Sequence, residues 1–272
     1  MNQALKDQRV QELISLYNNG DIKECLLRAK KVAKIYPEEP FVFNLIGVVS
    51  ASIGSYEEAI ESYKRALKIN PNYFEVYNNL GVALNDSKKP KDAISYLRKA
   101  LKINPHYPEA FNNLGNAFKE IENLDQAIES YENAIKLNPK FIDPYTNLAI
   151  VFVSKKNENE KAEYYFKKAL EISPENSEAL KYFSDFLVSI QRYSEAKALL
   201  EKCLILVPRN PDVFNLLGQV YKSENFEKAL EFYNNALHLS EDKESIQNNI
   251  GALYFEFNKV KRAIRYFKKI SN

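Results

Sequence analysis

The sequence contains few of the residues that most often carry chemistry or cross-links. Its 272 residues include two cysteines, two histidines, one methionine and no tryptophan. Two cysteines cannot form a disulfide framework, so we expect Cys25 and Cys203 to be buried free thiols in a reducing compartment, the cytoplasm. His106 and His238 are isolated, with no metal-ligand spacing, phosphate loop or nucleophile–base pair. We therefore expect no metal, no cofactor and no enzymatic activity.

Long apolar runs and a strong charge imbalance are also missing. The formal net charge is +2, and the longest uncharged run, residues 40–56, is too short to span a membrane. The first ten residues, MNQALKDQRV, lack the apolar core of a signal peptide. We therefore expect no membrane partner. The hydrophobic content of 45% is nevertheless sufficient for a packed core.

The dominant feature of the sequence is a period of about 34 residues. The segments Glu75–Pro105 and Glu109–Pro139 align without a gap at this shift. Five of the seven glycines share one position of the unit, which we number 8, and a proline recurs at position 32. The glycines are Gly47, Gly81, Gly115, Gly218 and Gly251, and the prolines are Pro37, Pro71, Pro105, Pro139, Pro174 and Pro208.

Each unit is predicted to be a pair of helices. Apolar residues at positions 4, 7, 8 and 11 define one helical face, and alanines at positions 20 and 27 mark a second helix with a small-residue side. Asn-Pro pairs such as Asn70-Pro71 are expected to end the second helix, with Asn tolerating left-handed geometry. We predict a single array, residues 1–272, with repeats at about 7–39, 40–73, 74–107, 108–141, 142–176, 177–210, 211–243 and a truncated 244–272.

These residues resemble the tetratricopeptide repeat. The resemblance rests on a large residue at position 4, Leu-Gly at 7 and 8, an aromatic at 11, Ala at 20, an aromatic at 24, Ala at 27 and Pro at 32. It covers essentially the whole chain. It implies an all-α fold, a right-handed superhelical solenoid of antiparallel helix pairs whose first helices line a concave groove.

Function is then expected to lie in that groove. Positions 2, 6, 9 and 13 of each first helix lie opposite its core stripe, and over the eight repeats they hold ten acids and neither Lys nor Arg. Acids at position 2 also favour helix N-termini, which accounts for half of them. The candidate peptide-binding residues are Asn79, Asn113, Asn116, Asn147, Asn249, Glu75, Glu109, Asp143, Glu178, Asp212, Tyr182 and Asp185.

The row of asparagines at position 6 is similar to the asparagine ladder of the O-GlcNAc transferase family. An amide offers a donor and an acceptor together, which suits the backbone of an extended peptide. Asn79, Asn113 and Asn147 are expected to be exposed, so that Ala there would weaken binding with little loss of stability. The asparagines at position 5 are equally consistent with polar filler.

Three functional classes follow. The leading hypothesis is a non-catalytic scaffold that binds a basic or neutral protein segment in an acidic, Asn-lined groove. The alternatives are the targeting arm of a larger enzyme, such as a glycosyltransferase or sulfotransferase, and an RNA-binding helical repeat. The acidic face argues against RNA, so we expect no nucleic-acid partner. At residues 260–270 an amphipathic helix retains Tyr266, Phe267 and Ile270 without a following cap, and a partner or an end-to-end homodimer is expected to cover it.

Overall fold

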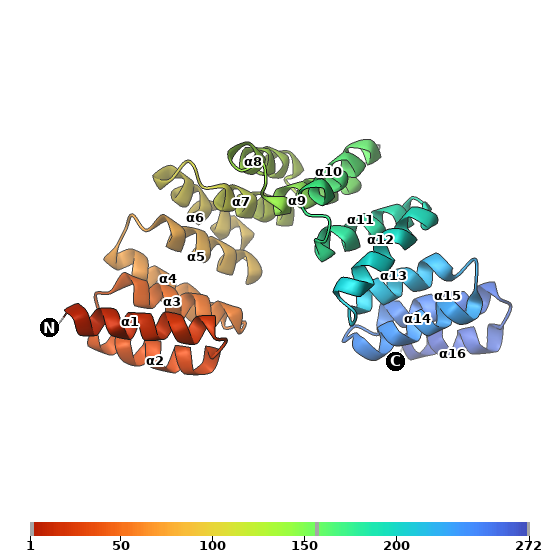
Figure 1. Cartoon of the computed structure of the whole chain (residues 1–272), viewed down its shortest axis with the longest axis horizontal. Helices are drawn as coiled ribbons and strands as arrows, with labels where there is room; N and C mark the ends of the chain where they lie inside the picture. Colours follow the sequence, from red (N-terminus) through yellow and green to blue (C-terminus); the bar gives the residue numbers. More distant parts are fainter. Residues whose placement is uncertain (1–2, 156–157, 271–272) are drawn as a thin grey trace. The chain divides into compact units, whose positions relative to one another are not determined.

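The chain is built from helices joined by short turns (Figure 1). The computed structural model describes residues 3–155 and 158–270, and these contain no strand, so the predicted all-α class is confirmed. The first helices of the repeats are α1 (Gln3–Asn18), α3 (Pro40–Ser52), α5 (Phe74–Asp86), α7 (Pro108–Glu120), α9 (Ile142–Ser154), α11 (Ser177–Ser189), α13 (Pro211–Tyr221) and α15 (Glu244–Glu256). The second helices are α2 (Ile22–Ile35), α4 (Tyr56–Ile69), α6 (Pro90–Ile103), α8 (Leu124–Leu137), α10 (Asn159–Ile172), α12 (Tyr193–Leu206), α14 (Phe226–Leu239) and α16 (Val260–Ile270).

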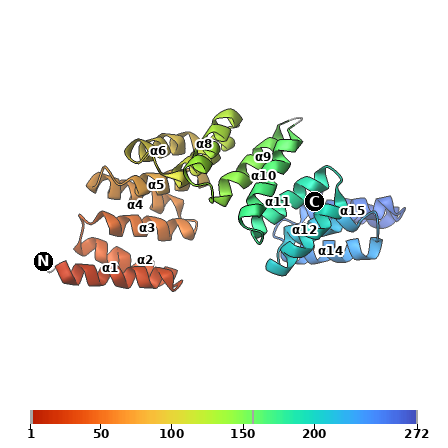
Figure 2. The same ribbon diagram turned by 45° about the horizontal axis from the view of Figure 1, so that its top comes forward.

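The helices form two compact units, Met1–Asn147 and Leu148–Asn272. Within the first unit, each first helix packs on the second helix of its own repeat, and α5 also contacts α3 and α7 (Figures 1 and 2). In the second unit, α11 contacts α12 and α13, and α13 contacts α14. Lys156 and Asn157 lie outside the described residues, as does the side chain of Ile270.

The glycine at position 8 makes room for a large side chain at position 24 of the same repeat. A Cβ atom on Gly115 would lie 2.5 Å from Cε1 of Tyr131, and one on Gly218 would lie 2.5 Å from the ring of Tyr233. Both tyrosines are almost fully buried. The glycine therefore accommodates a side chain of the second helix, which is a ring at these two positions and Leu97 at Gly81.

The intra-repeat turn depends on one left-handed residue at position 15. In the second repeat this residue is Gly54, with a φ of 76°. The residues at the same position in four other repeats have a side chain and still adopt positive φ: Lys88 (63°), Glu122 (59°), Gln191 (63°) and Asn258 (56°). A residue with a Cβ is strained in this region by roughly 1–2 kcal/mol. The turn geometry is therefore imposed by the packing of the two helices that it joins.

The Asn-Pro pairs end the second helices by a mechanism that differs from the one expected. Asn70, Asn104 and Asn138 are extended, with φ between −138° and −124°, so the expectation of left-handed geometry is wrong. Extended backbone is what a following proline favours. The side-chain oxygen of each Asn accepts a hydrogen bond of 3.1 Å from the backbone N–H two residues later. This Asx turn reverses the chain at the end of the helix.

The last helix packs on the first helix of its own repeat, α15. The ring of Phe267 lies against Gly251, where a Cβ would come within 2.5 Å of Cε1. Tyr266 stacks on Tyr254 with ring centroids 5.7 Å apart. Tyr266 and Phe267 therefore contact α15, although Phe267 is still 36% exposed. Among the described apolar side chains of α15 and α16, the most exposed is that of Phe255, at 62%.

If the turn is strained, a variant with Gly at position 15 should be more stable than one with Ala, the reverse of their order inside a helix. We expect Glu122→Gly to be more stable than Glu122→Ala by about 0.5–1 kcal/mol, because only Gly adopts positive φ without cost. At Glu129, an exposed position inside α8, Gly should be less stable than Ala by about 1 kcal/mol. Urea unfolding followed by circular dichroism measures both pairs. The same order at both positions would show that the turn is not strained.

Candidate functional site

The candidate site is the surface formed by positions 2, 5, 6, 9 and 13 of the first helices, which we call the first-helix face. In the first unit it includes the half-buried Glu75 on α5, the exposed Glu109 on α7 and the exposed Asp143 on α9. Each of these acids lies in the first turn of its helix. A carboxylate there interacts favourably with the helix dipole, so these positions are suited to the fold as well as to a ligand.

The asparagines at position 6 are hydrogen-bonded to asparagines at position 5 of the preceding repeat. In the first unit, Nδ2 of Asn79, Asn113 and Asn147 donates to Oδ1 of the partner Asn on the preceding first helix, at 3.1, 2.9 and 3.0 Å. The partners are Asn44, Asn78 and Asn112. In the second unit, Asn249 donates to Asn215 at 2.9 Å. The asparagines at position 5 therefore have a structural role that the sequence did not indicate.

These contacts change the expectation for Asn79, Asn113 and Asn147. All three are half-buried rather than exposed, and each joins two neighbouring first helices. An amide has two donor hydrogens and an acceptor oxygen. One N–H of each position-6 amide is used between repeats, which fixes the direction in which the amide points. The row therefore presents oriented amides to the first-helix face.

Asn116, the candidate at position 9 of α7, is held by the core. Its Oδ1 accepts a 2.8 Å hydrogen bond from the Tyr131 hydroxyl. Tyr131 is fully buried, and burial raises the pKa of its phenol. The amide of Asn116 satisfies the polar end of that ring, which would otherwise be desolvated without a partner. Its role is at least in part to support the Gly115–Tyr131 contact.

Lysines outside the four predicted positions reach the acids of the first-helix face. Lys88, in the turn after α5, lies 3.9 Å from Glu120, and Lys222, at the end of α13, lies 3.0 Å from Glu256. Lys181, at position 5 of α11, lies 3.1 Å from Asp212. A long side chain places its charge several ångströms from its Cα. Counting charges by helical position alone therefore overstated the acidity of this face.

The first unit carries tyrosines beside its acids. Burial, followed by the charges of Glu109 and Glu75, raises the pKa of Tyr107 to about 12. The ring of Tyr107 packs edge-on against Phe74, with centroids 5.2 Å apart. Partial desolvation also raises the pKa of Asp143, although its side chain is exposed. Aromatic faces beside carboxylates are favourable surroundings for a cation.

In the second unit, the first-helix face contains a cavity of about 230 Å³ between α11 and α13. Of the predicted residues it brings together Tyr182, Asp185 and Asp212. The ammonium of Lys181 is hydrogen-bonded to Asp212 and lies 4.8 Å from the ring centroid of Tyr182. Burial disfavours the charged form of Lys181, but the hydrogen bond and charge of Asp212 outweigh this, so its pKa is raised. Glu178 is exposed and does not line the cavity.

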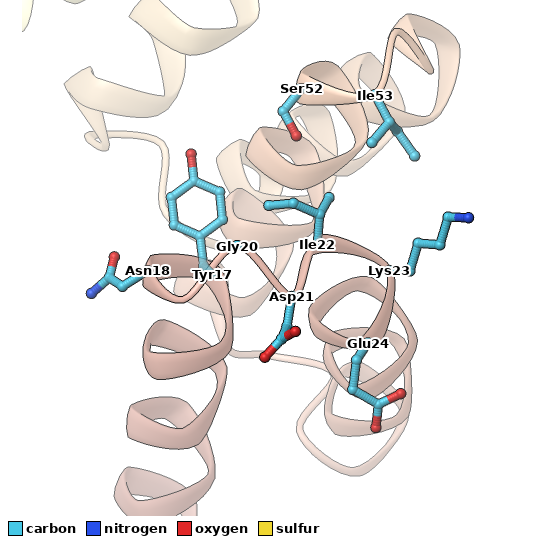
Figure 3. Close-up of a pocket in the computed structure, with 9 residues that line it drawn as sticks. All are labelled: Tyr17, Asn18, Gly20, Asp21, Ile22, Lys23, Glu24, Ser52 and Ile53. Atoms are coloured by element: carbon cyan, nitrogen blue, oxygen red, sulfur yellow. The ribbon is translucent and has the colours of Figure 1, made fainter.

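A larger cavity, of about 890 Å³, lies at the α1–α2 turn, beside the end of α3. Figure 3 shows that its side chains do not converge: Asp21 and Glu24 point to one side, Lys23 to another, and Asn18 away from the centre. Gly20, with a φ of 81°, forms the turn. This hollow is a consequence of the loop geometry, and it has no constellation of groups that would perform chemistry.

The two cysteines are separate and buried. Sγ of Cys25 donates to the carbonyl oxygen of Leu13, Sγ of Cys203 to that of Ser177, and burial raises the pKa of both thiols. Among residues 3–155 and 158–270, no three His, Cys, Asp or Glu side chains form a group suited to a metal ion. In the same ranges, no helix is long and apolar enough to cross a membrane.

Family models match much of the chain. Models described as "Tetratricopeptide repeat" match residues 74–107, 108–141 and 154–220, and a model described as "TPR repeat" matches residues 47–87. The matched segments include the first-helix face of α5 and α7 and the cavity between α11 and α13.

Known proteins are similar to parts of the chain. The Protein CTR9 homolog of Arabidopsis thaliana is 30% identical over 111 residues, which is 39% of this chain, and the chain spans about 10% of that protein. A crystal structure of MamA is 31% identical, with a TM-score of 0.54, over 59% of this chain and 93% of that one. A tetratricopeptide repeat protein of Parabacteroides merdae, 17% identical with a TM-score of 0.71 over 91% and 98%, supports the fold alone.

Breaking one amide pair should destabilise the stack of helices. We expect Asn113→Ala to lower the free energy of unfolding by about 1–3 kcal/mol, because Oδ1 of the buried Asn78 loses its donor. The double variant Asn78→Ala/Asn113→Ala should lose less than the sum of its single variants. The control is Asn234→Ala, at an exposed position in α14, which should be neutral or stabilising. Equal effects of Asn113→Ala and Asn234→Ala in urea unfolding would rule out a structural role for the pair.

Proposed function

Because the chain belongs to the tetratricopeptide repeat family, we propose that it is a non-catalytic scaffold that binds an extended, basic or neutral protein segment on its first-helix face. The family and the helical fold support a protein-interaction scaffold as the general role. The preference for a basic or neutral segment rests on the chemistry of the face.

The oriented amides of the first-helix face carry this proposal. Each position-6 amide is fixed by a bond to the preceding repeat and keeps one N–H for another partner. Oδ1 of Asn79 also accepts a 3.5 Å hydrogen bond from Nδ2 of Asn78. An extended peptide has one donor and one acceptor per residue, so a row of oriented amides matches its backbone. The neighbouring acids Glu75, Glu109 and Asp143 then favour basic side chains on that peptide.

Two other roles follow from different observations. The chain spans about 10% of the CTR9 homolog that it matches, so a targeting arm within a larger protein is a second role that we propose. RNA binding is less favoured, because Glu75, Glu109 and Asp143 stand where phosphate binding would need Lys or Arg. The cytoplasm is the compartment proposed for the chain, because both buried thiols are free.

We also propose end-to-end pairing of two copies through α15 and α16. Phe255 and Ile264 are 62% and 46% exposed, which leaves apolar surface at this end of the second unit. A second copy would bury the same surface on both partners. The basic residues of α16, including Arg262, Arg265 and Lys268, would then approach one another. Salt screens that repulsion, so pairing should become stronger as ionic strength rises.

The first prediction of the proposed role concerns ligand charge. An acidic peptide with a free carboxyl terminus should not bind, whereas a peptide of the same length with Lys in place of each acid should bind. Glu75→Gln/Glu109→Gln/Asp143→Asn should weaken binding of the basic peptide about tenfold at low salt, because attraction between complementary charges is lost. Fluorescence anisotropy measures both affinities.

The matched control for this triple variant removes three acids from elsewhere in the same unit. Glu122→Gln/Glu129→Gln/Glu132→Gln makes the same charge change at exposed positions in α8 and the turn before it. This control should retain the affinity of the unmodified chain for the basic peptide. An equal loss of affinity in both triple variants would show that the preference for the basic peptide depends only on net charge. Micromolar binding of the acidic peptide would contradict the proposed specificity.

The second prediction concerns pairing. Sedimentation velocity over a range of concentrations should show a dimer that becomes more populated with added salt. Ile264→Lys should abolish it, because it places a charge within the apolar contact. Ile205→Lys, at an 81% exposed position on α12, is the control and should leave pairing unchanged. A chain that stays monomeric at every concentration and salt would disprove the interface.

A further inference from the structure

Four steps between neighbouring first helices share one polar contact; the step from α11 to α13 lacks it, as does the step from α1 to α3, where Gln11 and Leu45 stand at these positions. At the steps from α3 to α5, α5 to α7, α7 to α9 and α13 to α15, an amide at position 6 donates to an amide at position 5. At the step from α11 to α13 these two positions hold Lys181 and Leu216. The first-helix face opens here into a cavity of about 230 Å³.

The groups around this cavity favour a cation. Two carboxylates, Asp185 and Asp212, line it together with the ring of Tyr182 and the amides of Asn215 and Gln219. Asp185 is exposed, and among the described residues it is not hydrogen-bonded to another side chain. Partial desolvation raises the pKa of Asp185, and the charge of Asp212 raises it further against the opposing effect of Lys181. Because Lys181 offsets only one of the two carboxylates, the cavity has one negative charge in excess.

A cation already occupies part of this environment. The Lys181 ammonium donates to Oδ2 of Asp212 at 3.1 Å, and it lies 4.8 Å from the ring centroid of Tyr182. These two contacts are those that an incoming cationic side chain would make. A guanidinium would make them better than an ammonium, because its planar fork can bridge two carboxylates and stack on an aromatic ring.

We propose that the cavity between α11 and α13 is a subsite for an arginine side chain of the bound segment, and that Lys181 is an internal cation which that side chain displaces. This inference rests on the proposed function, since it assigns one side chain of the bound segment. In the free protein, Lys181 compensates Asp212 and holds the two helices together. In the complex, the guanidinium lies between Asp185 and Asp212, and Lys181 turns outward on its flexible stem.

A purely structural role for Lys181 makes the opposite prediction. If the ion pair only replaces the missing amide pair, removal of the charge leaves the affinity for arginine unchanged or reduces it by loosening the two helices. If Lys181 competes with the ligand, its removal increases that affinity. The direction of the change therefore distinguishes the two roles.

The test uses the full chain and N-acetyl-arginine amide as the probe. Backbone amide shifts in NMR spectra should change on α11 and α13, and Lys181→Met should lower the dissociation constant about three- to tenfold, because a like charge near the guanidinium is removed. Lys181→Gln, a second neutral variant, should act in the same direction. Asp185→Asn should weaken binding by a similar factor. No gain with either lysine variant would overturn the proposal.

Lys222→Met provides a matched control. Lys222 makes an ion pair of nearly the same length, 3.0 Å, with the next first helix of the same unit, and it does not line the cavity. Lys222→Met should leave the dissociation constant unchanged. An equal gain with Lys222→Met would attribute the effect to net charge and overturn the proposal, as would shifts confined to other helices. N-acetyl-norleucine amide should produce no shifts on α11 and α13.

Failure of this inference and failure of the proposed function give different results. If the chain binds the basic peptide but Lys181→Met does not increase arginine affinity, only the subsite is wrong. If the probe binds between α11 and α13 but no extended peptide binds, the subsite stands and the peptide-binding role is wrong. Circular dichroism melts of each variant confirm that a loss of binding does not come from unfolding.

Discussion

The structure depends on how closely the first helix of each repeat approaches the second. The ring of Tyr131 occupies the space that a Cβ on Gly115 would need, and the same contact recurs between Gly218 and Tyr233 in the second unit. Alanines at positions 20 and 27, such as Ala127 and Ala134, are fully buried beside this contact. The two helices of one repeat bury only part of each other's apolar surface. The next repeat must therefore bury the rest.

The stacking of neighbouring repeats determines how the polar residues of the first helices are buried and hydrogen-bonded. Neighbouring first helices come near enough for Asn113 to reach Asn78, and both side chains lose part of their hydration. A half-buried amide without a partner would cost free energy, so the pairing of amides between repeats is a requirement of the stack. The same requirement orients the amides. A polar row that is needed for stability is thereby pre-organised as a surface for binding a backbone.

The period, the all-α class and the recurrence of glycine at position 8 could be recognised from the sequence, because each repeats in phase and depends on a local pattern. The sequence did not predict the left-handed conformation of Glu122, since Glu has no preference for positive φ and only the packing of two helices imposes it. It misjudged the Asn residues at position 6 because their partners lie on another repeat. It also missed Lys181, since helical position locates a Cα and not the charge at the end of a long side chain. Contacts between repeats are thus the part of the site that pattern alone does not contain.

The departure of Lys181 and Leu216 from the amide pattern has a physical consequence for selectivity. Paired amides are neutral and accept many sequences, because they recognise the backbone that all peptides share. A carboxylate pair beside an aromatic ring, as in the cavity between α11 and α13, recognises charge. Lys181, which pairs with Asp212, also limits which cations bind, since a weakly bound cation gains too little free energy to displace it. A row of paired amides interrupted by this charged step can therefore combine broad backbone binding with selection of a single side chain.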